Sequence, residues 1–179
     1  MSAHALLRVA TRAAHDRVDA TFSDLDLGDA ADYRLFMTAQ AGAFLSVEAA
    51  LDAAGVATLF PHWPERRRSH LLRADLDALN LAVPAVDATV SFGSPAEVAG
   101  GAYVLEGSRL GGAMLARSVG AGLPRAFLDA PQVSGQWRDF LTALEQLLSS
   151  PLQRRDAVAG AGRVFDHFAL AAGEATKDR

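Results

Sequence analysis

The chain has 179 residues, half of them apolar, and a formal net charge of −4 at pH 7. It contains no cysteine, which excludes disulfides, thiolate metal sites and a cysteine nucleophile. Its arginines are scattered, its apolar runs are too short to cross a membrane, and its first residues lack the apolar block of a secretory signal, so we expect a cytoplasmic protein that binds neither nucleic acid nor membrane.

Apolar residues recur at intervals of three and four along most of the chain, which is the spacing of one helix face. This pattern predicts helices over residues 2–22, 32–54, 65–80, 95–120, 132–149 and 152–173, with a short helical turn over 124–130. Ser2 and Ser94 are suitable N-caps, Pro95 suits a first helical turn, and Gly55 suits a helix stop. Residues 81–93 contain the only strand-like stretch, which is too isolated to form a sheet.

The expected fold class is therefore all-α, with six to eight helices packed as a bundle. At this length we expect a single domain over residues 1–179, with a frayed tail from about residue 174.

The first predicted helix divides into an apolar stripe and a polar edge. The stripe is expected to consist of Leu6, Leu7, Ala10, Ala14 and Val18, and the sector beside it holds Arg8, Thr11, His15 and Asp19. A histidine at the border of a core can reach into a cleft while a neighbour holds its other ring nitrogen. Most such histidines are surface or structural residues, so the residues alone leave both roles open for His15.

One local run of positive charge, Arg66–Arg68, falls in the helix predicted over 65–80. We interpret this run as a solvated helix face. The alternative is that one or two of these arginines contact an anionic group of a ligand.

The helix that begins at Pro95 contains glycines where a helix should avoid them. Gly107, Gly111 and Gly112 are three glycines in six residues, and each costs about 1 kcal/mol relative to alanine inside a helix. One narrow sector of this helix carries almost no side chains, because it consists of Gly100, Val104, Gly107 and Gly111. Either another helix packs closely into this groove, or a large flat molecule lies against it.

Several enzyme classes lack their motifs here: there is no nucleophile elbow, no phosphate-binding loop, no zinc-binding His-Glu-x-x-His and no pair of Glu-x-x-His segments for a di-iron site. What remains is His15 and the glycine-rich helix, which together suggest a planar cofactor held between two helices. Haem fits this arrangement, because a neutral imidazole is one of its usual iron ligands.

Two motifs resemble those of a known family. LRVATRAAHDRVD (residues 7–19) resembles the proximal-helix motif of haem oxygenases. YVLEGSRLGGAMLAR (residues 103–117) resembles their glycine-rich distal helix, in the form seen in bacterial members related to the Pseudomonas enzyme and to those encoded beside bacteriophytochromes. The order of the motifs, their spacing and the closing RVFDHF (residues 163–168) are similar too, so the resemblance covers nearly the whole chain.

The resemblance implies a set of site residues. His15 would be the axial iron ligand, and Arg8 would contact a propionate. Thr11 and Asp19 would flank His15, and Phe165 or Phe168 could pack at the ring edge, although plain core packing is the commoner role for either phenylalanine. The floor of the distal pocket would be Gly107, Gly111 and Gly112. The animal-type motif has an aspartate where this chain has Ser108, so the residue that orders distal water stays open between Arg109 and one of Arg66–Arg68.

The resemblance also implies the reaction. Haem b would be both cofactor and substrate, cleaved with O2 and reductant to biliverdin, carbon monoxide and ferrous iron. Electrons would come from an external donor of the ferredoxin or reductase type, and the product would serve iron release or supply a bacteriophytochrome with bilin. Two alternatives remain: a haem carrier or sensor of the same fold, and a helical interaction module in which the glycines serve packing alone.

Overall fold

The computed structural model describes residues 1–85 and 89–177, and no described residue forms a strand. The helices in chain order are α1 (Ala3–Phe22), α2 (Ala30–Ala53), α3 (Val56–Leu59), α4 (Trp63–Arg66), α5 (Ser69–Ala78), α6 (Pro95–Leu115), the 3₁₀ turn η1 (Ala116–Ser118), α7 (Gln136–Leu147) and α8 (Pro151–Ala175). The expected all-α fold is confirmed. Of the strand-like stretch, residues 86–88 lie outside the described residues, as do residues 178–179 of the tail.

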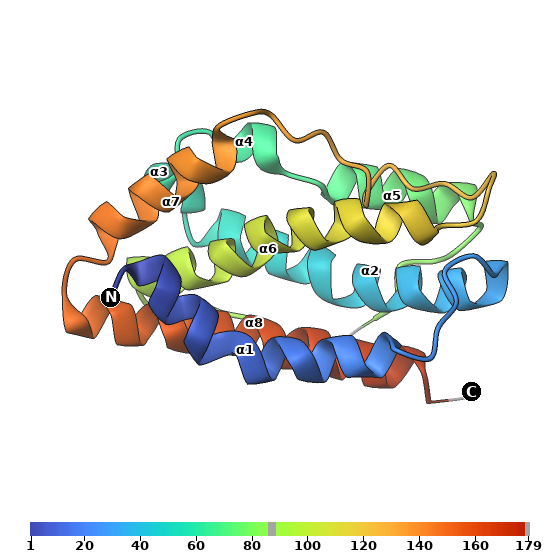
Figure 1. Cartoon of the computed structure of the whole chain (residues 1–179), viewed down its shortest axis with the longest axis horizontal. Helices are drawn as coiled ribbons and strands as arrows, with labels where there is room; N and C mark the ends of the chain where they lie inside the picture. The colour runs from blue at the N-terminus through green and yellow to red at the C-terminus, as the bar shows by residue number, and fades with distance from the viewer. Residues whose placement is uncertain (86–88, 178–179) are drawn as a thin grey trace.

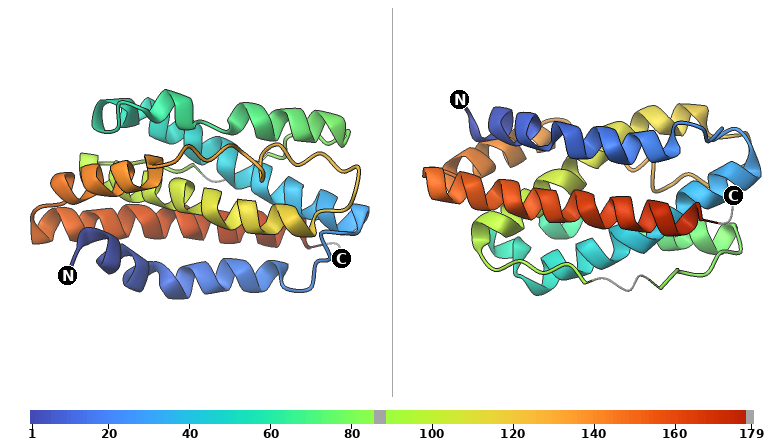
Figure 2. Two further views of the ribbon diagram at one scale, coloured as in Figure 1. Left: turned by 45° about the horizontal axis from the view of Figure 1, so that its top comes forward. Right: turned by 90° about the horizontal axis from the view of Figure 1, so that it is seen from below.

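Helix α8 is the common support of the molecule. It runs along the bundle, and α1, α2 and α6 all pack against it (Figures 1 and 2). Its start is fixed locally: the Ser150 hydroxyl accepts from the backbone N–H of Gln153, the Gln153 side chain accepts from the N–H of Ser150, and Pro151 occupies the first turn. The two helices predicted to hold the site, α1 and α6, therefore share one long neighbour.

Two glycines allow α6 and α8 to touch backbone to backbone. A Cβ atom added to Gly100 would lie 1.9 Å from the carbonyl oxygen of Ala157, and one added to Gly160 would lie 2.2 Å from that of Glu97. Any side chain at either position would force the helices apart. Close helix packing, one of the two explanations for the glycine groove, is therefore correct for Gly100.

The core follows the expected helix faces with one exception in α1. The predicted inner residues of the last helix and of the 124–130 turn are all buried: Ala157, Ala161, Phe165, Phe168, Ala172, Phe127 and Leu128. In α1, Leu7 is buried and Leu6, Ala14 and Val18 are partly buried, but Ala10 is exposed and Thr11 is buried in its place. The Thr11 hydroxyl donates to the Leu7 carbonyl oxygen at 2.8 Å, which satisfies its polar group inside the packed face.

The prediction of one continuous helix over residues 65–80 is wrong, because the chain forms two helices there. Arg67 is extended (φ −63°, ψ 141°), which ends α4 and separates it from α5. The break turns Arg66 and Arg68 inward, where both are buried, so the solvated face assigned to Arg66–Arg68 is also wrong for these two. Short α3 was not predicted, and α7 begins at Gln136 because Gly135 before it is left-handed (φ 88°).

Among residues 1–85 and 89–177, no helix is both long and apolar enough to span a bilayer.

Candidate active site

His15 lies on an exposed part of α1 with its ring held on two sides. Its Nδ1 is 3.1 Å from a carboxylate oxygen of Asp19, one helical turn further on, and 59% of the side chain is exposed. The ring meets Phe165 of α8 edge-on, with centroids 5.8 Å apart. With Nδ1 directed at Asp19, Nε2 is the nitrogen that can bind a metal, and the carboxylate fixes the tautomer that permits it.

The other predicted residues of α1 differ in exposure. Thr11 is buried and bonded to its own helix, which makes it part of the packing beneath His15. Arg8 is exposed and lies close to Tyr103 of α6. Burial raises the pKa of the Tyr103 hydroxyl, and the positive charge of Arg8 opposes this shift. The charge of Arg8 on α1 therefore lies near the Tyr103 hydroxyl on the glycine-rich helix.

Four of the glycines of α6 face three different surroundings. Cβ atoms added to Gly107 and Gly111 would meet no heavy atom of the described residues within 4 Å, apart from the local helix backbone. A Cβ at Gly112 would lie 3.2 Å from the carbonyl oxygen of Leu128. We call Gly107 and Gly111 the bare strip. It is an open stretch of backbone, which fits a flat ring, whereas Gly100 at the other end of the same groove is closed by α8.

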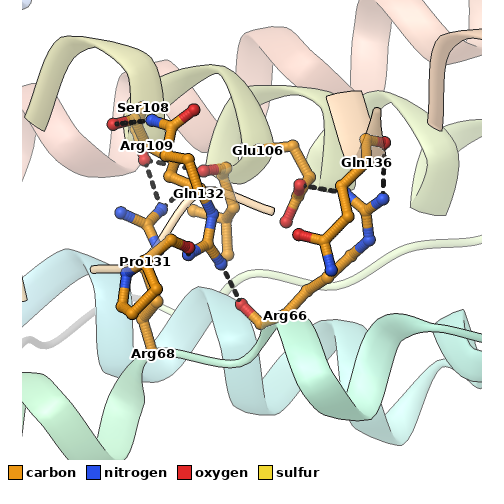
Figure 3. A network of polar contacts seen from close by, with 9 residues as sticks. Arg66, Arg68, Glu106, Ser108, Arg109, Pro131, Gln132 and Gln136 are labelled. Atoms are coloured by element: carbon orange, nitrogen blue, oxygen red, sulfur yellow. Dashed lines mark hydrogen bonds and ion pairs between the residues drawn. The ribbon is translucent and has the colours of Figure 1, made fainter. Parts of the chain in front are cut away.

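Ser108, next to the bare strip, is held by a buried arginine (Figure 3). The Ser108 hydroxyl donates to the Leu105 carbonyl oxygen at 2.7 Å, and Nη2 of Arg68 donates both to Ser108 Oγ at 2.7 Å and to the same carbonyl at 2.6 Å. The Arg68 guanidinium lies 4.7 Å and 5.0 Å from the ring centroids of Phe44 and Phe127. Burial lowers the pKa of Arg68 to about 9, so the side chain is still charged at neutral pH.

Two further arginines, Arg66 and Arg109, donate to backbone carbonyl oxygens around α6. Arg66 forms a buried ion pair with Glu106 and donates to the Gln136 carbonyl oxygen at 2.6 Å. Arg109 donates to the carbonyl oxygens of Arg66 at 2.6 Å and Pro131 at 3.2 Å (Figure 3). Burial lowers the pKa of Arg109. Helix α6 is thereby joined to α4 and to the segment that precedes α7.

A small cavity lies between α6 and residues 132–137. Its volume is about 170 Å³, and its walls include Glu106, Arg109, Gln132 and Gln136. Arg109 Nε is buried and has no hydrogen-bond partner within the described part of the chain. A cavity of this size can hold several water molecules.

The sequence patterns missed the acidic members of this network. Glu48 accepts from the backbone N–H groups of Arg68 at 2.8 Å and Ser69 at 3.0 Å, and so holds the first turn of α5. Glu106 pairs with Arg66. The signal that could have found both is a carboxylate on the apolar face of a helix, since a charge is rarely buried there without a partner.

Comparisons with known proteins point to one family and one fold. The family model for heme oxygenase matches residues 1–171. A heme oxygenase of Xanthomonas campestris pv. campestris (strain 8004) is 42% identical over 114 residues, which cover 59% of this chain and 67% of that protein. The crystal structure of the NO- and CO-bound heme oxygenase from Neisseria meningitidis has the same fold, with a TM-score of 0.84 and 23% identity, and the match covers 98% of this chain and 92% of that one.

Proposed function

The chain belongs to the haem oxygenase family, whose enzymes degrade haem with O2 to biliverdin, and we propose that this reaction takes place between α1 and α6 with His15 as the iron ligand. Two features together support this proposal: His15, whose Nδ1 lies beside the Asp19 carboxylate, and the open helix backbone at Gly107 and Gly111. One supplies a ligand of fixed orientation. The other leaves room for a ring.

On the proximal side, Asp19 and Phe165 orient the imidazole, while Thr11 is buried in the packed face of α1 one turn before it. Nε2 is then the coordinating atom, while the Asp19 carboxylate beside Nδ1 orients the ring. Bound haem b supplies the iron at which O2 is reduced, and the same molecule is the substrate.

At the edge of the ring, Arg8 is proposed to contact a propionate. A guanidinium offers paired donors to a carboxylate, and the neighbouring Tyr103 hydroxyl adds a third. These two side chains come from α1 and α6, so the contact would bring both walls of the site onto one ligand group.

On the distal side, Gly107 and Gly111 are proposed to let the α6 backbone approach the ring, while Gly112 serves the close contact with Leu128. Ser108 directs its proton at the Leu105 carbonyl oxygen and accepts from Arg68, so its hydroxyl is occupied. Arg109 lies two positions from both Gly107 and Gly111, which places it about 160° around α6 from the bare strip, and it donates to the carbonyl oxygens of Arg66 and Pro131. Its side chain is therefore directed away from a ring on the strip. Ordering of distal water is then left to one of Arg66–Arg68, of which Arg68 reaches Ser108 beside the strip.

The remaining parts of the proposal concern the setting of the reaction. The chain is proposed to act as one cytoplasmic domain over residues 1–179. It would receive electrons from an external ferredoxin or reductase and release biliverdin, with a bacteriophytochrome as one acceptor.

The test is an optical titration of the purified protein with hemin, followed by addition of reductant under air. A Soret band that decays as biliverdin absorption grows is the expected result. A Soret band that persists under these conditions would instead identify a haem carrier or sensor of the same fold, and the absence of any band would contradict haem binding altogether.

A further inference from the structure

The sector of α6 that contains the bare strip continues beyond Gly111 to Met114. At 100° per residue, Met114 points within about 20° of Gly107 and 60° of Gly111, so the three residues occupy one sector of the helix. Met114 is therefore the first side chain on this line after two glycines. It is also 71% exposed, although it lies on a helix whose first half is almost wholly buried.

The surroundings of Met114 are apolar as well. Leu110 and Leu115, its neighbours on the same end of α6, are exposed too. Scattered exposed apolar residues need no explanation, and Leu152 and Leu170 of α8 are of that kind. Three together beside an open backbone strip indicate a surface that a ligand covers.

The direction of a helical side chain decides what Met114 can reach. Long side chains on a helix lean toward its N-terminus and cover the preceding turn. The thioether of Met114 is thus directed over the turn that contains Gly111, that is, over the bare strip. From Gly107 to Met114 the helix rises about 10 Å, a length comparable to a porphyrin ring.

We infer that Met114 lies over one edge of the haem ring and determines which meso carbon is open to oxygen. This inference rests on the proposed function of the bare strip. Methionine suits the role, because its unbranched, flexible side chain adapts to a flat surface that a branched side chain would clash with. One ring edge is then covered by the thioether, while the edge over the glycines is left free.

Oxidative footprinting tests the contact without turnover, because the chain has only three methionines and they differ in exposure. Met1 is 78% exposed and Met37 is 0% exposed, so one serves as the reactive control and the other as the unreactive control for Met114. The protein is treated with chloramine-T in the dark, with and without saturating gallium protoporphyrin IX, and sulfoxide is measured by mass spectrometry of tryptic peptides.

The expected result is a several-fold slower oxidation of Met114 when the porphyrin is bound, with Met1 unchanged and Met37 unreactive in both samples. An unchanged rate at Met114 in a sample whose absorption spectrum shows bound porphyrin overturns the inference. Failure of the porphyrin to bind at all contradicts the proposed function instead, so the two failures are distinguishable.

Product analysis tests the steering. Met114→Ala is expected to increase the share of a second biliverdin isomer, whereas Met114→Leu, which keeps the bulk, should retain the wild-type distribution. Leu152→Ala on α8 is the matched control for loss of an exposed apolar side chain. An isomer distribution in Met114→Ala equal to that of the wild type would overturn the steering role.

Discussion

Replacing Gly107 with alanine is expected to stabilise the protein in the absence of haem. Gly107 lies inside α6, and the added methyl group would meet nothing beyond the local helix backbone within 4 Å in the described structure. Alanine is favoured over glycine in a helix by about 1 kcal/mol, in part because it narrows the unfolded ensemble. For a chain of this length, that corresponds to a rise in Tm of about 2–4 °C.

The same substitution at Gly100 should act in the opposite direction, and it is the matched control. Its methyl group would lie 1.9 Å from a backbone oxygen of α8, which cannot rotate away as a side chain could. The helices must separate, and overpacking of this kind typically costs about 1–3 kcal/mol or more. The propensity gain of alanine is too small to offset this cost, so Gly100→Ala should unfold at a lower urea concentration than the wild type.

Bound haem should work against the stability gained by Gly107→Ala. The added methyl group would stand on the bare strip, so the variant should bind hemin more weakly and gain less stability from it than the wild type. The assay is urea unfolding followed by circular dichroism, with and without hemin, together with a hemin titration. A Gly107→Ala protein that is less stable without haem, or that binds haem as tightly as the wild type, would refute the reasoning about the open strip.

Three further predictions follow from the site. His15→Ala should change the free energy of unfolding by no more than about 0.5 kcal/mol, since the side chain is largely exposed, but should remove the histidine-ligated Soret spectrum; an unaltered spectrum would contradict the axial role. Arg66→Met should cost about 3–5 kcal/mol by leaving Glu106 buried without its partner, and the double variant with Glu106→Gln should recover part of this loss; equal stability of the single and double variants would argue against the ion pair. Burial lowers the pKa of His167, whose Nε2 lies 2.7 Å from Ser46 Oγ, so its contribution to stability is complete above the unfolded pKa of about 6.5 and is lost as pH falls through the lower folded value. Urea unfolding between about pH 5 and 7.5 should show this loss, and His167→Gln should reduce the slope; the same slope in both proteins would exclude His167 as its source.

The long helices, and the starts of α1 and α6, could be predicted because the signals are local. Ser2 and Ser94, the two predicted N-caps, each accept a hydrogen bond from the backbone N–H three residues further on, and this capping depends on almost nothing else in the fold. The two helices that we propose to hold the site, α1 and α6, were predicted for the same reason, since the positions of His15 and of the α6 glycines form patterns within single segments.

The buried arginines could not be predicted in this way. Arg66 and Glu106 are separated by 40 residues, and so are Arg68 and Ser108, so these contacts exist only because the folded chain brings residues 66–68 beside α6. An arginine in a polar run predicts exposure on local grounds. The extended backbone at Arg67, which no local pattern indicated, turns its two neighbours toward the core.

The glycines of α6 and the buried arginines have opposite effects on the stability of the same helix. Three glycines within Gly107–Gly112 weaken α6 by about 3 kcal/mol relative to alanine, in the stretch where the backbone must stay bare. Arg68 donates to Leu105 and Ser108 from the side away from the strip, and a hydrogen bond from a charged donor contributes about 1.5–3 kcal/mol. These two bonds act on the same turns of α6 and oppose the deficit. The charge that is buried on one side of α6 thus supports a glycine-rich helix in the stretch where side chains are missing on its other side, which is the stretch against which we propose that the haem ring lies.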